Sequence, residues 1–184
     1  PQPEAALKFG PNIAEWPPIP ALADNLLMQV ASVLRDPVTT TDELIPSGET
    51  SSYRSNPMKL ASFALSRRDP DYVPRALDTQ ALETARQAGS LPAQVQEALE
   101  KLGQGSLAPA AFQIGSVIFA NKPGDGSARE QAASCQRVLG GCANICYEFA
   151  TKRYRSNCVN WGMLPFTLAE GDAFTCQPGD FIYV

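Results

Sequence analysis

Short apolar runs alternate with helical patterns along the second half of the chain. Three runs are apolar and rich in β-branched or aromatic residues, which predicts strands at 114–120, 142–147 and 163–168. The intervening segments, 127–139 and 148–154, have helical composition, and Gly140-Gly141 ends the first of them. Strands that alternate with helices pair in parallel, so this half of the chain predicts an α/β fold with a central sheet flanked by helices.

The first half of the chain has a less regular pattern. Six prolines lie between Pro1 and Pro20, which is typical of an extended linker or of an irregular segment that lies on another domain. In residues 21–33 the apolar positions fit one face of a helix and also alternate with polar positions as in a strand, so a helix and a strand both remain possible. Apolar residues at helical spacing predict helices at 58–65, 80–87 and 92–102.

A long polar segment interrupts these elements at residues 39–57. It is irregular and exceeds an ordinary connection in length, and long loops inside a domain are usually functional. The chain closes on a β-type run, 179–184, with no turn or polar tail after it, and it begins with Pro1. We therefore expect it to be a piece of a longer protein, truncated at its C-terminus.

Composition narrows the possible functions. The chain has 184 residues, a length that predicts a single domain. Its 15 basic and 19 acidic side chains give a formal net charge of -4, which is unlike the basic surface of a nucleic-acid-binding protein. No apolar run approaches the length of a membrane span, and no leader opens the chain. These features predict a cytoplasmic protein with neither a nucleic-acid nor a membrane partner.

Cysteine and histidine usage limits the available chemistry. The chain has no histidine, the usual general base near neutral pH, so catalysis must use other side chains. Its five cysteines, at spacings unlike a CxxC pair or a zinc ribbon, read as reduced cytosolic thiols and small core residues. No metal-binding residue is predicted in this chain.

Ser127 is the first candidate for chemistry, because it follows the turn Gly124-Asp125-Gly126 and precedes Glu130 by three residues. One interpretation is a capping box between Ser127 and Glu130. The other is an anion site, because the free N–H groups at a helix start attract negative charge and favour a serine alkoxide. Arg129 favours the second interpretation, since a cation in the first turn opposes the helix dipole unless an anion such as a carboxylate is expected there.

Arg54 is the second candidate, because it lies in the long polar segment among Ser51, Ser52, Tyr53 and Ser55. A solvated surface arginine is the alternative. Other basic residues are interpreted as solvated faces or contacts between domains: Arg67, Arg68, Lys152, Arg153 and Arg155.

The motifs in this order resemble one family. Residues 124–133 (GDGSAREQAA), Leu139-Gly140-Gly141, Arg155-Ser156-Asn157 and residues 162–166 (GMLPF) resemble the swivelling C-terminal domain of the aconitase family. Thr40-Thr41-Asp42 is similar to the start of that domain in aconitases, and Leu44-Ile45-Pro46 is similar to isopropylmalate dehydratase small subunits. The combination looks most like a bacterial hydratase branch of the family and implies a swivelling β/β/α domain.

The resemblance implies a role for each matching residue. Ser127 would be the catalytic base, and Arg54 and Arg129 would each bind a substrate carboxylate. Ala128 takes a substrate-binding position where the family hallmark has a second serine, and it lacks that hydroxyl donor. The resemblance also requires the Arg54 loop to fold back beside Ser127.

Family members remove and re-add water on a hydroxy di- or tricarboxylic acid at a [4Fe-4S] cluster. The cluster-binding cysteines of the family lie in its other domains, so the resemblance implies no cluster and no activity in this chain alone. Glu43 is a second departure, because it stands where aconitases carry histidine. The expected partners are a small hydroxy-carboxylic acid and the other domains of the same enzyme.

The implied domain runs from residue 38 to residue 184, after a linker or domain start at 1–37, with a helical insertion at 72–104. The leading hypothesis is the mobile C-terminal domain of an iron-sulfur hydro-lyase. A separate small subunit of a two-chain dehydratase is one alternative. A non-catalytic ligand-binding module with the same fold is another, suggested by Ala128.

Overall fold

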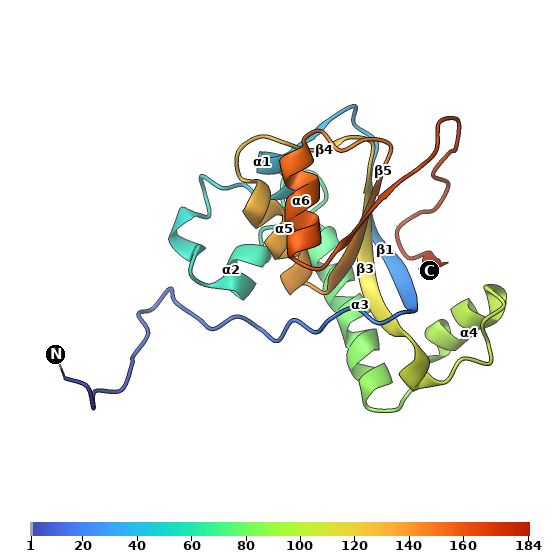
Figure 1. Ribbon diagram of the computed structural model, residues 1–184, viewed down its shortest axis with the longest axis horizontal. Coiled ribbons are helices and arrows are strands. Elements are labelled where there is room, and N and C mark those ends of the chain that lie inside the picture. The colour runs from blue at the N-terminus through green and yellow to red at the C-terminus, as the bar shows by residue number, and fades with distance from the viewer. Residues whose placement is uncertain (1) are drawn as a thin grey trace.

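The computed structural model describes residues 2–184 and is built on a five-stranded sheet (Figure 1). The strand order is β6-β5-β3-β1-β7, in which the first four strands are parallel and β7 runs antiparallel to β1. The bounds are β1 Leu26–Leu34, β3 Gln113–Ala120, β5 Gly141–Cys146, β6 Leu164–Thr167 and β7 Phe181–Tyr183. The predicted α/β fold is confirmed.

The strands explain the apolar runs of the sequence. All eight residues of β3 and all six of β5 are buried, which is the expected pattern for parallel strands covered on both faces. Residues 26–34, which overlap the segment 21–33 that left helix and strand open, form the single strand β1. This strand pairs with β3 on one side and β7 on the other, so it lies inside the sheet.

The helices are α1 Thr41–Leu44, α2 Pro57–Ala61, α3 Tyr72–Gln87, α4 Ala93–Lys101, α5 Arg129–Val138 and α6 Lys152–Asn160, with short 3₁₀ turns η1 Ser51–Tyr53 and η2 Pro109–Ala111. Most of them gather on one face of the sheet, the C-terminal segment covers the other, and α4 lies apart, beside that segment (Figure 1). On the helical face, a core of residues from α2, α3, α5 and α6 packs on Ala31 and Ile118. On the opposite face, the ring of Phe174 stacks on Phe119 at a centroid distance of 4.2 Å.

Several predicted elements have other bounds in the structure: the helix expected at 80–87 is the second half of α3, and the helix expected at 58–65 is the shorter α2. The helix expected at 148–154 begins later, as α6, because Thr151 caps it by accepting a hydrogen bond from the N–H of Tyr154. The segment 39–57 is not irregular throughout, since it contains the two-residue strand β2 (Thr39–Thr40), α1 and η1. Thr40 and Glu43 form a complete capping box at the start of α1.

None of the helices within residues 2–184 is both long and apolar enough to cross a membrane.

A glycine turn leads from the sheet to α5. Strand β4 (Pro123–Asp125) pairs with β2, and the chain then turns through Gly124 and Gly126, whose φ angles are +94° and +134°. A Cβ on Gly124 would lie 2.2 Å from Cγ of Tyr154, and one on Gly126 would lie 2.2 Å from Oγ1 of Thr41. The turn therefore needs glycine for its backbone conformation and for its close contacts.

Tyr154 is held beneath this turn by a closed ring of buried hydrogen bonds. Nε2 of Gln136 donates to the Tyr154 hydroxyl at 2.8 Å, the hydroxyl donates to Oδ1 of Asn144 at 3.3 Å, and Nδ2 of Asn144 donates to Oε1 of Gln136 at 2.9 Å. The three side chains come from α5, α6 and β5, and each is at most 2% exposed. Burial raises the pKa of Tyr154 well above its usual value, so the hydroxyl keeps the proton that it donates.

We predict that Gly124→Ala destabilises the fold by about 3 kcal/mol or more, because overpacking against Tyr154 adds to the cost of a positive φ. Gly162→Ala is the matched control: Gly162 has a φ of +71° but no heavy atom within 4 Å of the added Cβ, so only about 1–2 kcal/mol is expected. Urea unfolding of both variants measures the difference. Equal losses would show that Tyr154 moves aside freely.

Candidate functional site

Ser127 and Ala128 leave the glycine turn at the start of α5. Ala128 is the N-cap residue of this helix and Ser127 precedes it, with its side chain exposed. Within residues 2–184 no side chain caps the start of α5, so the interpretation of Ser127 and Glu130 as a capping box is wrong. Glu130 instead accepts a hydrogen bond from Nε1 of Trp161 at 3.1 Å. The first N–H groups of α5 are therefore left without a side-chain acceptor from the cap.

Arg54 lies at the C-terminal end of η1 and is exposed. Tyr53 anchors this turn, because its ring packs on the helical core and stacks on Phe63 at a centroid distance of 5.7 Å. The N–H of Ala14 donates to the carbonyl of Ser55 at 2.9 Å, which fixes the backbone directly after Arg54. The Arg54 backbone is thus held from both sides.

The structure brings the two segments together around one pocket. The pocket has a volume of about 330 Å³ and is lined by Ser47, Arg54, Ser127, Ala128, Glu130 and Gln131. Three of the four residues for which a role was expected, Ser127, Ala128 and Arg54, therefore share one concave surface. Their roles stay a prediction.

Arg129, the fourth of these residues, does not line the pocket. Its side chain is half-buried, and its Nε is buried without a hydrogen-bond partner among residues 2–184. Within the same residues neither Arg54 nor Arg129 forms an ion pair, and the same holds for Arg35, Arg137, Arg153 and Arg155, whereas Arg67, Arg68, Arg75 and Arg86 each pair with a carboxylate. An unpaired arginine in the first turn of α5 adds to the positive end of the helix dipole, so this region favours an anion.

Sequence reasoning did not identify Ser47, Glu130 and Gln131 as pocket residues. Glu130 and Gln131 lie in the first turn of α5, so their nearness in sequence to Ser127 is the signal that could have identified them. No local pattern indicates Ser47, whose place depends on the tertiary fold.

The cysteines do not fit an iron-sulfur cluster. Cys135, Cys142, Cys146 and Cys158 are buried, and burial raises the pKa of each thiol to about 12. Cluster ligands are thiolates, which such burial disfavours. Across residues 2–184 no three His, Cys, Asp or Glu side chains are grouped so that they could hold a metal ion.

We predict that the thiol of the half-buried Cys176 is the first to react with a thiol reagent at pH 8 in the folded chain, although burial and the nearby Asp180 raise its pKa, while all five thiols react after unfolding. The raised pKa values of the other four leave very little thiolate at that pH, and their burial limits access. Counting released chromophore against time measures this. Rapid reaction of a second thiol would contradict the burial described here.

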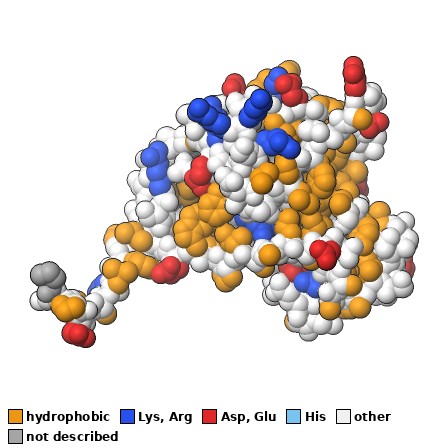
Figure 2. Space-filling view, in the orientation of Figure 1, with side chains coloured by type: hydrophobic (Ala, Val, Ile, Leu, Met, Phe, Trp, Pro, Cys, Tyr) orange, Lys and Arg blue, Asp and Glu red, His pale blue; other side chains and the backbone are white. Residues whose placement is uncertain are grey.

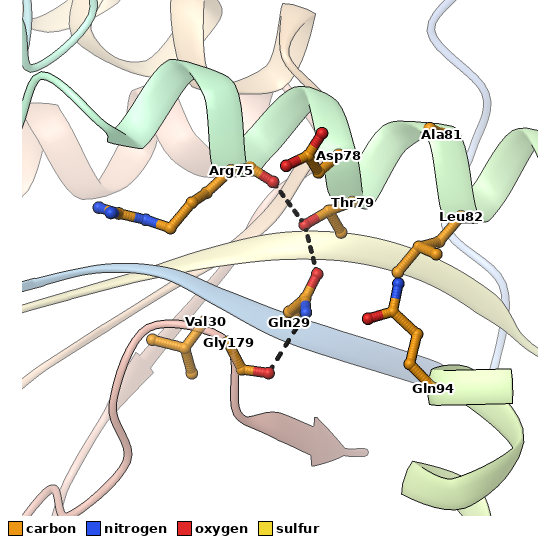
Figure 3. Close-up of a pocket in the computed structure, with 9 residues that line it drawn as sticks. All are labelled: Gln29, Val30, Arg75, Asp78, Thr79, Ala81, Leu82, Gln94 and Gly179. Atoms are coloured by element: carbon orange, nitrogen blue, oxygen red, sulfur yellow. Dashed lines mark hydrogen bonds between the residues drawn. The ribbon is translucent and has the colours of Figure 1, made fainter. Parts of the chain in front are cut away.

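A second concavity lies between α3, β1, α4 and the C-terminal segment (Figure 3). It has a volume of about 360 Å³. Two of its polar side chains are joined by hydrogen bonds: Thr79 donates to Oε1 of Gln29, and Nε2 of Gln29 donates to the carbonyl of Gly179. Ser127 and Arg54 are not part of it. Arg54, which lines the Ser127 pocket and forms no ion pair within residues 2–184, favours that pocket as the functional site.

Comparison with known proteins identifies the segment around this pocket. Residues 110–171 match the family model of the aconitase C-terminal domain. The resemblance to the aconitase family is confirmed. Aconitate hydratase A of Bradyrhizobium diazoefficiens is 42% identical over 64 residues, which are 34% of this chain and 7% of that protein. The chain thus matches a small part of the length of this curated relative.

A solved structure extends the likeness at the level of the fold. The crystal structure of 3-isopropylmalate dehydratase from Methanocaldococcus jannaschii superposes with a TM-score of 0.53 at 20% identity, over 86% of this chain and 70% of that chain. The swivel-domain fold expected from the resemblance is confirmed. Ser127, Ala128 and Arg129 lie inside the matched segment 110–171, whereas Arg54 lies outside it.

Proposed function

We propose that this chain is the swivelling domain of an iron-sulfur hydro-lyase that dehydrates and rehydrates a hydroxy di- or tricarboxylic acid. Ser127 serves as the base, and Arg54 and Arg129 bind carboxylates. The observation that carries the proposal is the pocket shared by Arg54, Ser127 and Ala128, whose α5 side lies in the segment that matches the aconitase C-terminal domain. The five free cysteines suit a protein of the cytoplasm.

The surroundings of Ser127 suit a base. A serine hydroxyl is a weak base until its alkoxide is stabilised, and the start of α5 together with Arg54 and Arg129 supplies positive charge there. In the proposed step, Oγ takes a proton from the carbon next to a substrate carboxylate, and hydroxide leaves the neighbouring carbon for an acceptor in another domain. Arg54 lines the pocket and binds one carboxylate there, and Arg129 binds the second once its half-buried side chain turns toward the substrate. Their charges stabilise the negative charge that develops.

The rest of the reaction has to come from outside this chain. Arg54, Ser127 and Glu130 are exposed, so water reaches the pocket unless another surface covers it. The cysteines here do not fit a cluster, so we assign the [4Fe-4S] group of the family to other domains of the same enzyme. A separate small subunit is the second candidate, favoured by the extent of the fold likeness to 3-isopropylmalate dehydratase.

We predict that Arg54→Ala weakens citrate binding to the 184-residue chain by about 10- to 100-fold, because charged hydrogen bonds contribute about 1.5–3 kcal/mol each. Isothermal titration calorimetry measures the affinity. Arg67→Ala is the matched control, because this substitution removes the same charge from an arginine that is already paired with Asp42 and Glu49. Equal weakening in both variants, or no citrate binding by the unchanged chain, would contradict the proposal.

We predict that Ser127→Ala lowers kcat of the assembled enzyme by about 10²- to 10⁴-fold, because a positioned base acts only while the proton moves. The dissociation constant for substrate is expected to change little. Ser90→Ala, at an exposed serine after α3, is the control and should leave kcat unaltered. Full turnover by the Ser127 variant would remove this residue from the mechanism.

A further inference from the structure

The N-terminal segment of the chain returns to the body of the protein beside the candidate pocket. Residues 2–13 extend away from the body, and residues 14–20 then run across the helical side (Figure 1). Figure 2 shows the same arm projecting from the space-filling body with hydrophobic side chains along it. Three contacts fix residues 14–20, which we call the strap: Ala14 to Ser55, Trp16 to Trp161, and Pro20, whose carbonyl accepts from Arg137.

Two of these contacts involve residues that adjoin the lining of the pocket. Ser55, which accepts from Ala14, is the residue next to Arg54. Trp161 stacks on Trp16 at a centroid distance of 4.9 Å and an interplanar angle of 29°, and its Nε1 donates to Oε1 of Glu130. Since Arg54 and Glu130 both line the pocket, the strap supports both sides of it.

Glu130 creates an electrostatic problem for this pocket. Its carboxylate lines the same cavity as Arg54, on the residue that follows Arg129. A carboxylate attached to the wall competes with any carboxylate ligand for the unpaired guanidinium groups, because it is always present at high local concentration. The hydrogen bond from Trp161 restrains Glu130 in a position where no ion pair with either arginine forms within residues 2–184.

We propose that Trp161 is a positioning residue that holds the Glu130 carboxylate away from Arg54 and Arg129, and that the strap residue Trp16 holds Trp161 in place. The identity of the ligand as a carboxylate rests on the proposed function. The restraint on Glu130 rests only on the contacts above. Loss of the indole N–H frees Glu130 to pair with an arginine, which lowers the affinity of the pocket for an external anion.

The central experiment removes the donor and keeps the ring. Trp161→Phe keeps an aromatic ring against Trp16 and the core but loses Nε1, and we expect it to bind citrate about 5- to 10-fold more weakly than the unchanged 184-residue chain. Adding Glu130→Gln to this variant should restore the affinity, because a neutral amide does not compete for the arginines. Unaltered affinity in Trp161→Phe, or no rescue by Glu130→Gln, would overturn the proposal.

A second measurement does not depend on citrate. The Nε–H groups of Arg54 and Arg129 are followed by nitrogen-15 NMR in the absence of ligand. In Trp161→Phe one of the two signals should shift and exchange more slowly with water as an ion pair to Glu130 forms, and Glu130→Gln should reverse both changes. Absence of these changes refutes the positioning role, whereas absence of citrate binding by the unchanged chain refutes the proposed function.

The strap is tested with Trp16. The chain has two tryptophans, which are the stacked pair, so the fluorescence of Trp161 can be followed once Trp16 is replaced. Trp16→Ala should weaken citrate binding in the same direction as Trp161→Phe and shift the remaining emission to longer wavelength. Trp16→Phe, which keeps a stacked ring, is the matched control and should retain the affinity. Full affinity in Trp16→Ala would remove the strap from the proposal and contradict it.

Discussion

The structure depends on the packing of the Tyr154 ring in the place where Gly124 has no side chain. The ring is fixed by hydrogen bonds that join α6 to α5 and β5, so the three elements have one relative arrangement. Gly124 then passes over the ring, and Oγ1 of Thr151 donates to its carbonyl at 3.1 Å. Since the turn is confined in this way, the direction in which the chain enters α5 is also confined, and with it the position of Ser127.

The other side of the turn depends on Thr41. Its Oγ1 occupies the space beside Gly126, and Thr41 opens α1, whose capping box is formed by Thr40 and Glu43. The turn therefore links the start of α5 to the segment that continues into Arg54. This link brings Arg54 close to the start of α5, where Arg129 and the positive end of the helix dipole lie. Neither arginine has a carboxylate partner within residues 2–184, so both are available to an anion.

Local patterns in the sequence predict the central strands and the glycine turn, because burial on both faces and positive φ angles leave direct traces in residue type. They do not decide between two identical capping signatures. Thr40 with Glu43 and Ser127 with Glu130 have the same spacing, but only the first forms a box. Glu130 instead accepts a hydrogen bond from Trp161, which is distant in sequence, and a tertiary contact of this kind leaves no local signal in the sequence. The approach of Arg54 to Ser127 likewise followed from the family resemblance and not from any periodicity.

The two sides of the pocket differ in how they relate to known proteins. The matched segment 110–171 contains the glycine turn, Ser127, Arg129 and Tyr154, so one side of the pocket and the packing beneath it form a unit. Arg54 and the strap lie outside this segment, and their backbone is fixed by separate contacts, at Tyr53 and Ser55. The two sides also meet through the contact of Thr41 with Gly126 and through the strap, so the pocket is preformed while Arg54 and Ser127 stay exposed. This property suits a domain that has to meet a second surface before its base is shielded from water.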